Sequence, residues 1–175
     1  MAKPRKMLGS AQSPYIHTLM RLIETQSMAT IARWCTDYAQ AHFLGIYEKT
    51  FPEDDRPEAA LAAAHNYFEG KAKLAEVKKC AAGVNAAARE AEGNPAAQAA
   101  ARAVAAAVAS VGTPTSSLGI AFYGAAAIAY DRVGTHESAE TYDQIASEES
   151  AKMEAALAAV AVEDEQNPAK INWYC

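Results

Sequence analysis

The chain has 175 residues, 51% of them hydrophobic, and a formal net charge of −5 from 16 basic and 21 acidic side chains. This length suits a single domain whose core needs neither disulfides nor a metal for support. The charges are dispersed without a concentrated basic field, which argues against nucleic acid as a partner.

The cysteines and the apolar regions indicate the compartment. Cys35, Cys80 and Cys175 are an odd number without CxxC spacing, so they favour a reducing cytoplasm over a disulfide framework or a zinc ribbon. No uninterrupted apolar run follows the charged N-terminus, so we expect no secretory signal. The most apolar region, residues 103–130, is interrupted by SVGTPTSS, so we expect no transmembrane helix.

Helix signals begin after a segment, residues 1–12, that we expect to be flexible. Capping residues before prolines indicate four helix starts, at Ser13-Pro14, Asn94-Pro95, Thr113-Pro114 and Asn167-Pro168. Asp55 and Glu58 have the spacing of a capping box. Glycines after apolar-periodic runs indicate helix ends, at Gly70, Gly93, Gly112 and Gly134.

These signals and the apolar periodicity predict seven helices and a short turn after Asn167. The expected helices are 14–26, 28–49, 57–69, 73–92, 95–111, 114–133 and 138–162. Alternating strand patterns are absent. We therefore predict an all-α protein, a compact bundle of about seven helices in one domain over residues 13–162, followed by a tail over residues 163–175.

One of these helices consists mostly of alanine. Ten of the fourteen residues from Ala96 to Ala109 are alanine, which favours helix and lets neighbouring helix axes approach closely. Because this segment is nearly apolar all round, we predict that the helix is central and surrounded by others. The alternative is a partly exposed alanine helix.

The sequence contains no reaction motif. The four histidines lie in different segments without metal-ligand spacing, so we expect no metal and no cofactor. The GxSxG elbow and the phosphate-binding loop are absent, which argues against an enzyme. His65 lies on the apolar face of its helix and suits a core histidine, with a ligand or general base as the alternative.

Two arginines are the most informative polar residues. Arg102 is the only charge between residues 93 and 130, so its guanidinium must reach water or find an acceptor. Gln98 lies one turn before Arg102, and Asn85 lies one turn before Arg89. Each of the two helices therefore presents a small polar stripe.

Two interpretations of these stripes remain open. One is a buried polar network with Glu90 or Asp131 that fixes helix register. The other is a ligand pocket between helices that gathers several side chains, Arg89, Arg102, Tyr123 and His65. The charge run FPEDDRPE is typical of a solvated loop with a helix cap.

The tail ends in INWYC, which is too apolar to remain in water. We predict that Trp173 and Tyr174 dock into a groove between helices of the same chain. The alternative is docking onto a second subunit, which would make the protein a homodimer.

The sequence from Ile31 to Tyr130 resembles the family of immunity proteins from bacterial polymorphic-toxin systems. The similar features occur in the same order: a proline-flanked acidic turn with an RP pair, an AAAR helix, the helix NPAAQAAARA, and a leucine-glycine helix with a tyrosine. Family members commonly have histidines before AAAR and before the LG helix. This chain has Asn85 and Ser117 there, which argues against a histidine-based ligand or metal site.

The resemblance implies a small cytoplasmic all-α protein that binds and neutralises a toxin domain. An acidic chain would suit a basic nuclease toxin. The alternative function is a small-ligand-binding protein or an enzyme with a polar pocket between helices. A DNA-repair or nuclease accessory protein ranks last, because the basic surface that binds nucleic acid is missing.

Overall fold

The computed structural model describes residues 3–173, and this part of the chain contains eight α-helices, one 3-10 helix and no strand. The elements are α1 (Pro14–Ile23), α2 (Met28–His42), α3 (Leu44–Thr50), α4 (Arg56–Phe68), α5 (Leu74–Glu90), α6 (Pro95–Ala109), η1 (Pro114–Leu118), α7 (Gly119–Val133) and α8 (Ala139–Val160). The prediction of an all-α bundle is confirmed.

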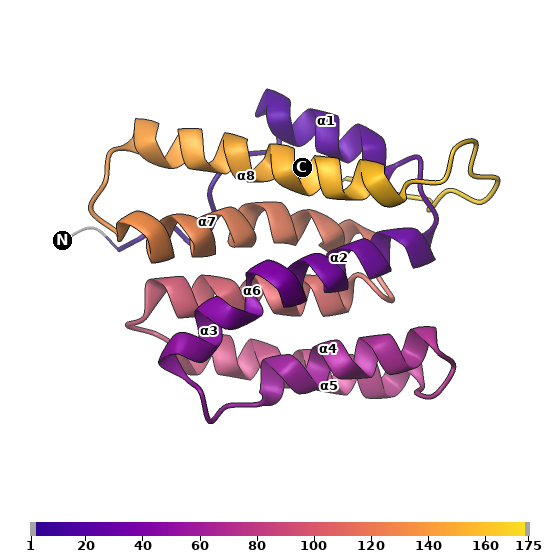
Figure 1. Ribbon diagram of the computed structural model, residues 1–175, viewed down its shortest axis with the longest axis horizontal. Coiled ribbons are helices and arrows are strands. Elements are labelled where there is room, and N and C mark those ends of the chain that lie inside the picture. Colours follow the sequence, from indigo (N-terminus) through magenta and orange to yellow (C-terminus); the bar gives the residue numbers. More distant parts are fainter. Residues whose placement is uncertain (1–2, 174–175) are drawn as a thin grey trace.

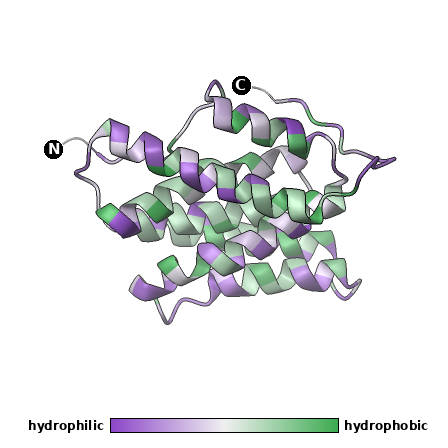
Figure 2. Ribbon diagram, turned by 45° about the horizontal axis from the view of Figure 1, so that its top comes forward, coloured by the Kyte–Doolittle hydropathy of each residue, from purple (hydrophilic) through white to green (hydrophobic). Residues whose placement is uncertain are grey.

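The alanine-rich helix α6 is the centre of the bundle, as predicted. It contacts α2, α3, α4, α5, α7 and η1. The pair α4 and α5 covers one side of it, and α8 with α1 lies beyond α7 on the other side (Figure 1). The hydrophobic residues concentrate on the helices in the middle of the molecule (Figure 2). Small side chains on α6 thus let many helices pack against one axis.

The range 28–49, predicted as one helix, is two helices. The break is at Phe43, whose φ of −110° departs from helical geometry and whose side chain is fully buried. The Phe43 ring occupies the space where Gly124 of α7 lacks a side chain. Tyr38 packs against the same ring, with 5.6 Å between the ring centroids. Burial of Phe43 against α7 therefore overrides the local helical preference.

Several predicted helix boundaries need correction. The helix expected over residues 114–133 begins as the 3-10 helix η1, and no turn follows Asn167. Asp55 is the N-cap residue of α4 but its side chain makes no capping hydrogen bond; Asp54 instead accepts from the backbone N–H of Arg56 at 3.1 Å. Three of the four glycines predicted to end helices, Gly70, Gly93 and Gly134, have the positive φ angles that favour glycine.

The segments before α1 and after α8 both pack against the bundle. Leu8 is buried, and its N–H donates to the carbonyl of Phe122 at 3.2 Å. The hydroxyl of Tyr130 donates to the carbonyl of Arg5 at 2.7 Å. After α8, the N–H of Ala169 donates to the carbonyl of Gln26 at 2.8 Å. These contacts bring residues from both ends of the chain to the groove described next.

Candidate functional site

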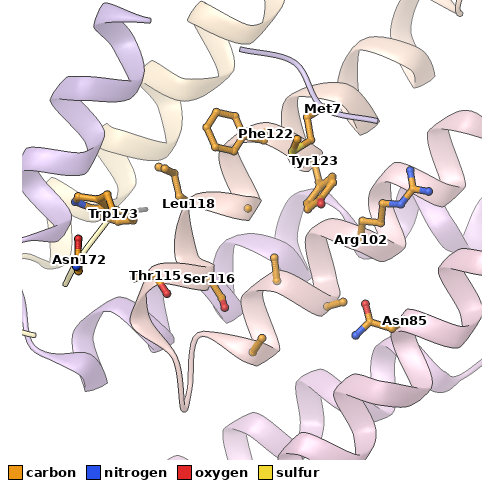
Figure 3. A pocket seen from close by; sticks show the side chains of 14 residues that line it. Met7, Asn85, Arg102, Thr115, Ser116, Leu118, Phe122, Tyr123, Asn172 and Trp173 are labelled. Carbon is orange, nitrogen blue, oxygen red and sulfur yellow. The ribbon is translucent and has the colours of Figure 1, made fainter. Parts of the chain in front are cut away.

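A groove of about 590 Å³ lies beside α6, between α5 on one side and η1 with the first turn of α7 on the other (Figure 3). Its floor is made of small residues of α6 and α7, which are Ala105, Ala106, Ala109 and Gly119. Its walls and ends are formed by Met7, Asn85, Arg102, Thr115, Ser116, Leu118, Phe122, Tyr123, Asn172 and Trp173. The alanine-rich helix thus leaves room for larger side chains from its neighbours.

The two ends of the groove differ in their side chains. Figure 3 shows Asn85 of α5, Arg102 of α6 and Tyr123 of α7 toward one end, and Trp173 with Asn172 at the other. Leu118 lies on the side of Trp173. The structure therefore brings together three of the polar residues that the sequence singled out.

Arg102 does not have the partners expected from the sequence. Glu90 instead accepts from Arg56, with an Nη2 to Oε2 distance of 2.6 Å. Asp131 accepts from Lys49 Nζ at 2.7 and 2.8 Å. Within residues 3–173, no carboxylate forms an ion pair with Arg102. The interpretation of Arg102 as part of a network with Glu90 or Asp131 is therefore wrong.

The surroundings of Arg102 carry an excess of positive charge. Arg102 also lines a smaller hollow of about 190 Å³, whose charged residues are Lys3, Arg5, Lys6 and Glu92. Lys3 Nζ donates to Glu92 Oε1 at 2.9 Å, and this hydrogen bond lowers the pKa of the Glu92 carboxyl. Four cationic side chains thus surround one carboxylate, which Lys3 already engages.

The remaining polar candidates lie elsewhere or have structural partners. Gln98 Nε2 donates to the carbonyl of Ala88 at 2.7 Å, which ties α6 to the last turn of α5. Arg89 is exposed and does not line the groove. His65 Nε2 lies 3.0 Å from Asp37 Oδ1, and this contact joins α4 to α2. A single pocket holding Arg89, Arg102, Tyr123 and His65 is therefore not formed.

Trp173 docks within its own chain. Its Nε1–H donates to Glu24 Oε1 at 2.6 Å, and its half-buried ring lines the groove. The Gln26 side chain holds the start of the tail: Oε1 accepts from the N–H of Val162 at 2.8 Å, and Nε2 donates to the Val162 carbonyl at 3.2 Å. Tyr174, the other predicted docking residue, lies outside the described residues.

Sequence reasoning missed several residues of the groove, notably Thr115, Ser116 and Phe122. A signal for two of them was present. The pair Thr113-Pro114 marks the start of the element after α6, so the polar residues that follow it lie in its first turn, beside the end of α6. Phe122 had no such signal, because it lies in a run that is apolar throughout.

The acidic turn FPEDDRPE contains an organised network rather than a solvated loop alone. Asp54 accepts from the Tyr47 hydroxyl at 2.5 Å and from Arg56 Nε and Nη2 at 2.9 and 2.7 Å. Its side chain is only 18% exposed. Hydrogen bonding from Arg56 holds the pKa of the Asp54 carboxyl far below its usual value. Because Arg56 also binds Glu90, the network joins the turn to α5.

Acidic side chains concentrate on α8 and in the residues on either side of it. Residues 137–165 contain nine carboxylates and one lysine, whereas the rest of the chain has 15 basic and 12 acidic residues. Six of the nine are exposed: Glu137, Glu140, Asp143, Glu148, Glu163 and Asp164. Of the other three, Glu154 and Glu165 are partly buried and Glu149 packs inward, where it accepts from Arg132 at 3.0 Å and Lys152 at 2.9 Å. We call residues 137–165 the acidic segment.

A family of proteins described as Imm-5 like putative immunity protein has a model that matches residues 21–156. The chain belongs to this family. The resemblance predicted from residues 31–130 is thereby confirmed, and the match extends it at both ends. No curated protein and no solved structure matches the chain.

Most residues that line the groove of this immunity-family protein lie within residues 21–156, the range that the family model matches. Asn85, Arg102 and Tyr123 lie inside residues 21–156, whereas Met7 and Trp173 lie outside it. None of the helices described is long and apolar enough to cross a membrane. Among residues 3–173, no three His, Cys, Asp or Glu side chains come together as metal ligands would.

Proposed function

We propose that this protein binds a bacterial toxin domain in the cytoplasm and neutralises it. The single observation that carries the proposal is the family match over residues 21–156, which covers α2 to α7 and most of α8. A protein that acts by binding needs a complementary surface but no reaction centre of its own.

The acidic segment is the surface that we assign to the toxin. It carries an excess of eight negative charges, more than the net charge of −5 of the whole chain. Complementary charge increases the association rate and disfavours partners of the wrong sign. The toxin domain would accordingly present a basic surface, as an enzyme that acts on nucleic acid does.

The first experiment uses the product of the neighbouring gene. The protein is co-expressed with this gene product, the candidate toxin, and growth rescue and co-purification are measured. The proposal expects both rescue and a stable complex. If the domain is toxic and the protein neither rescues growth nor co-purifies with it, the proposal is wrong.

A pair of charge-reversal variants tests the surface. Glu148→Lys with Glu163→Lys changes two exposed carboxylates of the acidic segment. Glu53→Lys with Glu76→Lys makes the same change of net charge at exposed positions before α4 and in α5. We expect the first pair to slow association about tenfold at low salt and the control pair to have a much smaller effect. Equal effects of both pairs would exclude the acidic segment as the binding surface.

A further inference from the structure

We propose that the groove beside Arg102 binds a small monocarboxylate that carries an apolar body. This site would be separate from the acidic segment and would serve a function beyond toxin binding. The groove volume of about 590 Å³ falls within the range of roughly 300–1,000 Å³ that is typical of small-molecule sites.

Arg102 provides the reason for an anionic group. Arg102 stands in a helix of alanines and is partly buried, and its guanidinium has no ion-pair partner within residues 3–173. Lys3, Arg5, Lys6 and Glu92 line the neighbouring hollow. Because Lys3 already pairs with Glu92, Arg5 and Lys6 leave an excess of positive charge beside Arg102 that favours an anion. A guanidinium presents parallel N–H donors that match the two oxygens of a carboxylate.

Neutral polar groups near Arg102 would orient the carboxylate. The amide of Asn85 and the hydroxyl of Tyr123 come from α5 and α7, and Figure 3 shows both residues on the side of the groove where Arg102 lies. A few polar groups that converge from different elements on a largely apolar pocket are typical of ligand sites. Arg102 is the only cationic side chain that lines this groove within the described residues, so a single negative charge is matched.

The other end of the groove would hold the apolar body. Leu118, Phe122 and Trp173 give it a mainly apolar lining, to which Asn172 adds one amide, and the alanines of the floor add only methyl groups. The Trp173 nitrogen is already bonded to Glu24, so the part of this ring that faces the groove is apolar. An aromatic or aliphatic chain attached to the carboxylate would be buried against these side chains.

Calorimetric titration of the full chain tests the ligand class. The probes are 3-phenylpropionate, octanoate, the uncharged 3-phenylpropionamide and inorganic phosphate. We expect at least one of the two carboxylates to bind with a Kd below about 1 mM, and the amide and phosphate to bind at least about tenfold more weakly. Absence of saturable binding by both carboxylates, or equally tight binding of the amide, would overturn the proposal.

A matched pair of arginine variants tests the position of the site. Arg102→Gln should weaken binding of the better carboxylate at least about tenfold, because it removes the cationic donor. Arg89→Gln removes an arginine from the exposed part of α5, outside the groove, and should leave the Kd within about twofold of the parent value. Thermal unfolding checks that both variants fold. If Arg102→Gln does not fold, Leu118→Gln tests the opposite end of the same groove. Unchanged affinity in the folded groove variant would refute the proposal.

Discussion

Gly119 of α7 lies so close to Ala106 of α6 that a Cβ built on the glycine would be 2.6 Å from the alanine Cβ. Real side chains do not approach so closely, so one of the two positions must lack a Cβ. The close approach of α6 and α7, and with it the floor of the groove, therefore depends on the glycine as well as on the alanines.

Gly119→Ala should destabilise the protein even though alanine is the better helix former. The added methyl would clash with Ala106, and overpacking of this kind costs about 1–3 kcal/mol. Urea unfolding measures the change in the free energy of unfolding. An unchanged or increased stability would show that α6 and α7 can separate without penalty.

Two variants serve as controls for that experiment. Gly45→Ala in α3 meets no atom within 4 Å, so it should raise stability by about 0.5–1 kcal/mol through helix propensity alone. Ala106→Gly combined with Gly119→Ala removes the clash and should recover part of the lost stability.

The central position of α6 was predictable because it follows from the composition of that one segment. Helix propensity and an apolar surface all round both point to a central α6, and the structure has it there. The break between α2 and α3 was not predictable, because it depends on Phe43 meeting Gly124, a residue far along the chain. Local signals cannot report such a contact, so residues 28–49 resembled one continuous helix.

The groove was predictable only in part for a similar reason. Spacing within a helix placed Asn85 and Arg89 on one stripe, and Gln98 and Arg102 on another. How far each stripe reaches into the groove depends on how the helices pack, which local spacing does not define. The structure directs Gln98 to a carbonyl of α5 and leaves Arg89 outside the groove.

Removing residues 171–175 should lower stability without changing the oligomeric state. The deletion removes the half-buried Trp173 ring and its hydrogen bond to Glu24, which together should contribute about 1–3 kcal/mol. Unfolding curves measure the loss, and light scattering measures the mass. A mass that falls to half would indicate that the tail joins two subunits, and unchanged stability would show that docking contributes nothing.

Cys35 and Cys80 should differ in reactivity. Cys35 is fully buried, and this burial raises the pKa of its thiol well above the usual value, whereas Cys80 is partly exposed. Because the thiolate is the reactive form, iodoacetamide at pH 8 should label Cys80 at least about tenfold faster. Peptide mass spectrometry follows each site, and labelling in urea serves as the control in which the difference should disappear. Equal rates in the folded protein would contradict the burial of Cys35.

Asp54→Asn should destabilise the protein in a pH-dependent manner. At pH 7 the variant loses the charged hydrogen bonds to Arg56, which should cost about 1–3 kcal/mol. Asp55→Asn is the matched control, because the neighbouring Asp55 side chain makes no capping hydrogen bond, and it should change stability by less than about 0.5 kcal/mol.

The sign of the pH dependence follows from the lowered pKa of Asp54. Folding holds this pKa well below the ordinary value of 3.8, so the unfolded chain takes up the proton at a higher pH than the folded protein does. The stabilising contribution of Asp54 is therefore fully present above about pH 5 and decreases as the pH falls through 3.8 toward the folded pKa. Urea unfolding at pH 7, 5, 4 and 3 should show the difference between the parent protein and Asp54→Asn shrinking below pH 5. A difference that stays constant down to pH 3 would show that the network with Arg56 does not depend on the charge of Asp54.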